Sequence, residues 1–120
     1  MSPRHSIRLR RVYDEPAADE GTRILVERLW PRGLKKEDVA ADLWLKEIAP
    51  SAELRKWYAH DVSKWKEFSR RYRAELEAND DALEPIRAAL KKGPVTFLFA
   101  ARDAEHSSAA LLKEYLEKSR

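Results

Sequence analysis

Runs of apolar residues along this chain predict three strands and a brief fourth one. Residues 6–13 alternate between apolar positions and arginines, which is typical of a strand with one covered face. The run over 23–30 is rich in aliphatic residues and must end at Pro31, because proline has no N–H to donate to a ladder. Residues 42–45 suit a brief strand, and residues 95–101 are apolar almost throughout, which predicts a central strand covered on both faces.

Apolar residues spaced by three and four positions predict four helices after the second strand. Their stripes are Leu54, Trp57 and Tyr58; Trp65, Phe68, Tyr72 and Leu76; Leu83, Ile86 and Leu90; and Leu112, Tyr115 and Leu116. Ser51 is placed to cap the first helix, Asp61 or Ser63 the second, and Ser107 or Ser108 the last. A short helical turn is also expected within 34–41, whereas the acidic segment 14–21 is expected to be an exposed connection.

This order of elements predicts an α/β fold: one small layered domain over residues 1–120, with a short, mainly parallel sheet flanked by helices. A chain of this length buries enough surface to fold without disulfides or a structural metal. The absence of cysteine excludes a disulfide framework, a thiolate zinc site and a cysteine nucleophile. The sequence shows neither a secretory leader nor an apolar run of membrane-spanning length, so we expect a cytoplasmic protein without a membrane partner.

Two charged segments follow predicted strands and form the candidate site. One is Leu29-Trp30-Pro31-Arg32-Gly33, and the other is Arg102-Asp103-Ala104-Glu105-His106. In an open α/β sheet, ligands bind beyond the carboxyl ends of the strands, where both segments are expected. Arginine forks and a helix N-terminus both suit phosphate or carboxylate groups, which predicts an anionic small molecule as ligand. The ligand-binding candidates are Arg28, Trp30, Arg32, Arg102, Ser107 and Ser108.

His106 is the candidate for proton transfer, because an imidazole titrates near neutrality. Asp103 is the second catalytic candidate, as a base or as the residue that orients His106, although capping and turn formation are the more common roles of residues in these positions. His60 and Asp61 are secondary candidates. No two histidines have the helical spacing of metal ligands, so neither a metal nor a cofactor is predicted. The sequence leaves open whether the site is catalytic, and it is silent on oligomeric state.

Two other functions remain open at this point. The chain has 24 basic and 21 acidic residues, a net charge of only +3 that is typical of a solvated surface. A nucleic-acid-binding or regulatory module is nevertheless the main alternative, and a partner-binding adaptor without pocket chemistry is the third. The basic residues available to the nucleic-acid module are Arg8, Arg10, Arg70, Arg71 and Arg73.

The order of motifs resembles the YeaO-like proteins of domain-of-unknown-function family 488. The shared motifs are Arg11-Val12-Tyr13-Asp14; Val26 to Gly33; Ala49-Pro50-Ser51; Leu54-Arg55-Lys56-Trp57; His60-Asp61; Trp65; Phe68; Arg71-Tyr72; and Ala100 to His106. The resemblance spans nearly the whole chain and implies a shared fold and shared site residues, but no reaction. This chain carries Arg102 where that pattern has lysine, and it lacks the cysteine that larger relatives have near the final loop.

Overall fold

A four-stranded parallel sheet forms the centre of the molecule. The computed structural model describes residues 6–15, 17 and 19–118. The strands lie in the order β1-β4-β2-β3, and every pair of neighbours is parallel. Their bounds are β1 Ile7–Arg11, β2 Thr22–Leu25, β3 Leu43–Trp44 and β4 Val95–Phe99. The predicted α/β fold with a short parallel sheet is confirmed.

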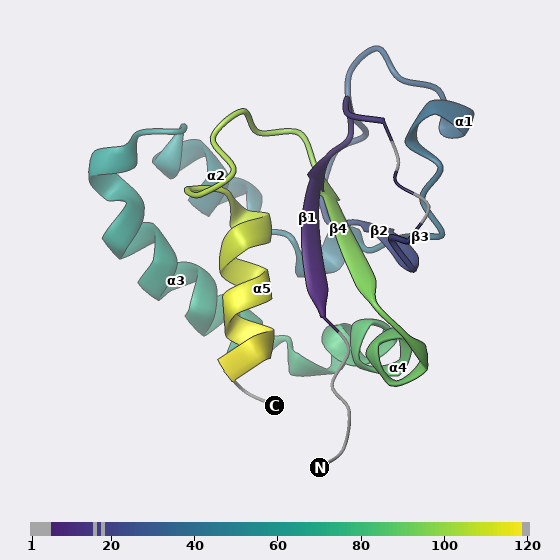
Figure 1. Cartoon of the computed structure of the whole chain (residues 1–120). Helices are drawn as coiled ribbons and strands as arrows, with labels where there is room; N and C mark the ends of the chain where they lie inside the picture. The colour runs from purple at the N-terminus through teal and green to yellow at the C-terminus, as the bar shows by residue number, and fades with distance from the viewer. Residues whose placement is uncertain (1–5, 16, 18, 119–120) are drawn as a thin grey trace.

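Helices cover the two faces of this sheet unequally (Figure 1). The longer helices contribute to one large core, together with alternate residues of the strands, whereas α1 packs on the opposite face through Val39. The helices are α1 Lys36–Val39, α2 Ala52–Tyr58, α3 Trp65–Ala78, α4 Glu84–Lys92 and α5 Ser108–Lys118. Within the described ranges, no helix combines the length and apolar character needed to cross a bilayer.

The central position predicted for the last strand is confirmed. β4 pairs with β1 on one side and with β2 on the other, and all five of its residues are buried. Phe97 lies opposite Leu9 of β1 and Ile24 of β2. Because a parallel sheet covered on both faces excludes water from its middle strand, a continuous apolar run suits that position.

The second strand is shorter than predicted, so its expected extent to Trp30 is wrong. β2 ends at Leu25. The last backbone hydrogen bond from this segment to β4 runs from the N–H of Val26 to the carbonyl of Leu98. Farther along, the carboxylate of Glu27 accepts the N–H of Ala100 at 2.9 Å. A side chain thus takes the position that a backbone carbonyl would need for the ladder to continue.

Two of the three predicted helix caps are confirmed. The Ser51 hydroxyl accepts the N–H of Leu54, and the Ser107 hydroxyl accepts the N–H of Ala110. The third expectation is wrong, because Asp61 accepts the N–H of Ser63 and so caps the 3-10 turn Val62–Lys64 that precedes α3. α3 begins without a side-chain cap because this turn leads directly into it.

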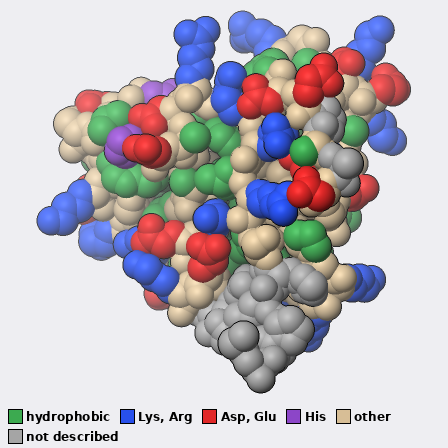
Figure 2. Space-filling view, in the orientation of Figure 1, with side chains coloured by type: hydrophobic (Ala, Val, Ile, Leu, Met, Phe, Trp, Pro, Cys, Tyr) green, Lys and Arg blue, Asp and Glu red, His purple; other side chains and the backbone are tan. Residues whose placement is uncertain are grey.

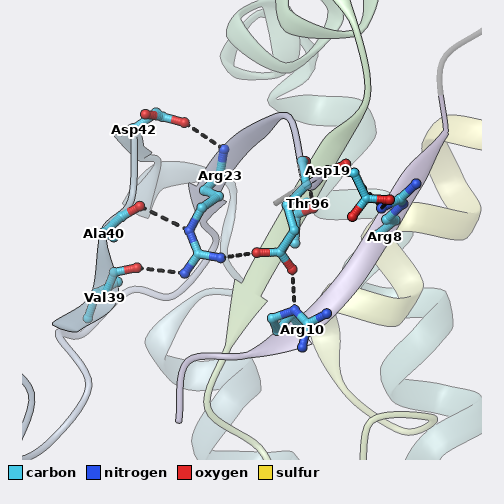
Figure 3. Close-up of polar contacts among 9 residues, drawn as sticks. Arg8, Arg10, Asp19, Arg23, Val39, Ala40, Asp42 and Thr96 are labelled. Atoms are coloured by element: carbon cyan, nitrogen blue, oxygen red, sulfur yellow. Dashed lines mark hydrogen bonds and ion pairs between the residues drawn. The ribbon is translucent and has the colours of Figure 1, made fainter. Parts of the chain in front are cut away.

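A buried ion network occupies the sheet face opposite the longer helices (Figure 3). Glu20 lies between Arg10 and Arg23 and pairs with both, and its side chain is only 3% exposed. The Arg23 guanidinium also donates to the carbonyls of Val39 and Ala40, which fixes α1 against the sheet. The expectation that segment 14–21 is exposed is therefore wrong for Glu20, because two guanidinium groups compensate the burial of its charge.

Candidate functional site

A cavity of about 150 Å³ lies where the chain leaves β2 and β4. The polar side chains in its wall are Glu27, Arg28, Arg55, His60, His106, Tyr58, Ser107 and Ser108. They come from the segment after β2, from α2 and the turn that follows it, and from the start of α5. The cavity therefore lies at the carboxyl ends of parallel strands, where open α/β sheets bind ligands.

The structure brings four of the predicted site residues together at this cavity: Arg28, His106, Ser107 and Ser108. His60, a secondary candidate, lines it as well. Figure 2 shows the described histidine surface gathered in one region, which in Figure 1 lies over α2 and the loop before α5. Segments far apart in the sequence thus contribute to one cavity.

Trp30 and Arg32 do not line the cavity. The indole N–H of Trp30 donates to the carbonyl of Leu34 at 2.7 Å, and its ring meets that of Trp44 edge-on at 5.3 Å. Arg32 is exposed, and its backbone carbonyl accepts the hydroxyl of Tyr13. Because β2 ends early, this loop runs toward the β3 edge of the sheet rather than over the strand ends.

Asp103 touches the site only through His106, and Arg102 is exposed outside the cavity. The Asp103 carboxylate accepts the backbone N–H of His106 at 3.2 Å and lies 2.8 Å from its ring Nδ1. The hydrogen bond from His106 lowers the pKa of Asp103 below its ordinary value. Asp103 therefore holds the imidazole in place as an ionised partner, while Asp61 caps its turn outside the cavity.

Arg28 lines the cavity, but part of its guanidinium is already hydrogen-bonded to the backbone. Its guanidinium donates to the carbonyls of Ala49 at 3.0 Å and Pro50 at 3.1 Å. These bonds fix the segment that enters α2, and with it the side chains that α2 presents to the cavity. Arg28 thus contributes positive charge and shape to the site.

Glu27 and Arg55 are the site residues that sequence reasoning missed. Glu27 is largely buried, and this desolvation raises the pKa of its carboxyl. The side chain of Arg55, on α2, forms no hydrogen bond or ion pair with another described residue, although it lines the cavity. In the sequence, Glu27 stands beside Arg28, and Arg55 lies within a family motif. Neither position reveals that the side chain is partly buried.

An unusual backbone places His60 at the cavity. Ala59 and His60 both adopt left-handed conformations, with φ of 44° and 59°. Residues other than glycine pay for this conformation, and such strain is often found at functional sites. Next to them in the sequence, Tyr58 donates its hydroxyl hydrogen to the His106 carbonyl at 3.2 Å. The ring of Trp65 meets the His106 ring edge-on, with the ring centroids 5.3 Å apart. This aromatic packing ties the end of α2 to the loop before α5.

A metal site and a nucleic-acid-binding surface find less support in the structure. In the part of the chain that the structure describes, no three histidine or acidic side chains are grouped to hold a metal ion. The five arginines of the nucleic-acid alternative each form an ion pair with a carboxylate. The pairs are Arg8 with Asp19, Arg10 with Glu20, Arg70 and Arg71 with Glu67, and Arg73 with Glu114.

Comparison with known proteins gives the family. The model of a family described as "Inactive DUF488-N3 subclade" matches residues 6–120. The chain belongs to the YeaO-like DUF488 family. It is 41% identical over 111 residues to the uncharacterized protein YeaO of Escherichia coli (strain K12), covering 92% of this chain and 96% of that one. It is 40% identical over 110 residues to the uncharacterized protein Rv3073c of Mycobacterium tuberculosis (strain ATCC 25618 / H37Rv), covering 92% of each. No solved structure matches this DUF488 chain.

Proposed function

We propose that this DUF488 chain binds a small molecule bearing a phosphate or a carboxylate in the cavity beyond β2 and β4. One observation carries the proposal: the Arg55 guanidinium lines the cavity and forms no hydrogen bond or ion pair with another described residue. A partly buried guanidinium is the group of choice for carboxylate and phosphate recognition, because its donors match the geometry of those anions.

Other groups near Arg55 also favour an anion. The Arg28 guanidinium lines the same cavity. Ser107 and Ser108 stand at the N-terminus of α5, a helix of 11 residues whose dipole presents its positive end there. A charged side chain and a helix dipole thus favour the same sign of ligand.

The size of the cavity limits the part of the ligand that enters. A volume of about 150 Å³ resembles that of an apolar cavity able to hold one benzene-sized ring. A phosphate group or a short carboxylic acid fits in this space. Any larger molecule would leave the remainder outside.

Binding without turnover agrees best with the family. The subclade is described as inactive. Asp103 is half exposed and contacts the cavity only through His106, so the pair suits a positioning role as well as proton transfer. We therefore assign Arg55 and Arg28 to anion binding, with His106 and Asp103 supporting them.

The test is a titration of the protein with inorganic phosphate, followed by amide chemical shifts in NMR. We expect the amides of Ser108 and Ala109 to shift, and Arg55→Gln to weaken the affinity about tenfold, the effect of a lost hydrogen bond to a charged group. Because no hydrogen bond or ion pair joins the Arg55 side chain to another described residue, its replacement should change the melting temperature little.

Arg70→Gln is the matched control. Arg70 is an exposed arginine on α3 that pairs with Glu67. The proposal predicts that this variant binds phosphate like the parent chain. Equal weakening in both variants would show a response to net charge, and shifts scattered outside the cavity would contradict the proposed site.

A further inference from the structure

The cavity contains a negative charge that an anion site does not explain. Glu27 is the one carboxylate among the described residues that line it. Oε2 of Glu27 accepts the N–H of Ala100 at 2.9 Å, whereas Oε1 has no hydrogen-bond partner within the described chain. Among the described residues no fully buried side-chain oxygen lacks a hydrogen-bond partner, so Oε1 of Glu27 is accessible from the cavity. Its free oxygen is therefore available for a donor from outside the protein.

Neighbouring cations do not satisfy this carboxylate. Arg28 directs its guanidinium at the carbonyls of Ala49 and Pro50. Arg55 and His60 are near enough to lower the pKa of Glu27 against the larger effect of its burial, but no ion pair joins either of them to it. Opposite charges thus line one cavity without forming an ion pair.

Two of the three hydroxyls in the wall, those of Tyr58 and Ser107, already form hydrogen bonds, whereas no hydrogen bond joins the Ser108 hydroxyl to another described residue. Tyr58 donates to the carbonyl of His106, and Ser107 donates to the carbonyl of Ala104 while it caps α5. Glu27 is consequently the charged hydrogen-bond acceptor in the described wall of the cavity. Arg55 is the charged donor there whose side chain forms no hydrogen bond or ion pair with another described residue. A ligand that satisfies both must carry complementary groups at its two ends.

We infer that the ligand of this cavity is a small anion that also carries a hydrogen-bond donor, a hydroxyl or an ammonium group, which binds Glu27 while the anionic group binds Arg55. This inference rests on the proposed function and narrows it to hydroxy acids, amino acids and related phosphates. Glu27 then determines specificity: it rejects plain anions by repulsion and accepts those whose donor compensates its charge.

The experiment compares three carboxylates of equal size: lactate, alanine and isobutyrate. They carry a hydroxyl, an ammonium and a methyl group at the same position, so they differ only in what they offer to Glu27. We expect lactate or alanine to bind about tenfold more tightly than isobutyrate in NMR titrations, as for hydrogen bonds to charged groups. The preferred one of the two identifies the donor.

Glu27→Gln provides the second comparison. Its amide still accepts the N–H of Ala100 but turns a donor toward the ligand, so the preference for lactate or alanine should fall to about parity and isobutyrate should bind more tightly. Glu77→Gln, an exposed position on α3, is the matched control and should retain the parent preference.

Each outcome separates the two proposals. Equal affinities in the parent chain, or a preference that Glu27→Gln leaves unchanged, would overturn the role of Glu27 while anion binding stands. Phosphate binding without binding of any of the three carboxylates would also overturn it. Failure of all four probes would remove both proposals.

Discussion

Glu27 shows how the environment of one residue decides its role. Its neighbour Arg28 is an evident candidate for anion binding because arginine is positively charged. A glutamate beside it is usually interpreted as an ordinary charged surface residue. Burial of Glu27 follows from a contact with Ala100, a residue 73 positions away. Composition and spacing cannot reveal such a contact, and for the same reason the free Arg55 was missed.

The raised pKa of Glu27 has a consequence for stability. Burial raises the pKa in the folded state above the ordinary value of 4.5, so the ionised carboxylate destabilises the fold above the folded pKa. This penalty disappears as the pH falls below 4.5, where both states are protonated. We expect Glu27→Gln to raise the melting temperature at neutral pH, with the difference shrinking toward pH 4 in thermal melts. A difference that grew on acidification would contradict this assignment.

Elements with a clear apolar stripe were predictable, and their ends were less so. The stripes of α3 and α5 and the capping serines depend on neighbours within one or two turns, which the sequence contains. The end of β2 depends instead on where β4 stops and on a side chain that interrupts the ladder. The displaced Trp30 and Arg32 are the direct result of that early end.

The network around Glu20 is expected to be the most sensitive polar element of the fold. Glu20→Gln removes the charge that compensates Arg23, whose side chain is only 10% exposed. Breaking a buried ion pair in this way costs about 3–5 kcal/mol. Urea denaturation should show this loss in the free energy of unfolding, whereas Glu15→Gln, at a nearby exposed position, should change it by less than about 0.5 kcal/mol. A small loss for Glu20→Gln would indicate that solvent reaches the network.

At the scale of the whole molecule, the arginines of the nucleic-acid alternative lie in two separate groups. Arg8 and Arg10 lie on the sheet face opposite the longer helices, while Arg70, Arg71 and Arg73 belong to α3. The two groups therefore form no continuous basic surface, and each arginine already has a carboxylate partner.

We accordingly expect no measurable binding of duplex DNA at physiological salt. Phosphate contacts to DNA release counterions, so any binding through these arginines would weaken steeply as salt rises. Fluorescence anisotropy of a labelled duplex over a range of salt concentrations provides the measurement. Tight binding with a steep salt dependence would instead restore the nucleic-acid alternative.

The strand order also bears on how the chain is made. β1 has a single neighbour, β4, and the two are separated by more than 80 positions in the sequence. During synthesis on a ribosome, the first strand must wait for nearly the entire polypeptide before it meets its partner. Fragments that stop ahead of residue 95 would expose that strand to solvent and lack part of the cavity wall, which makes premature termination costly for this architecture.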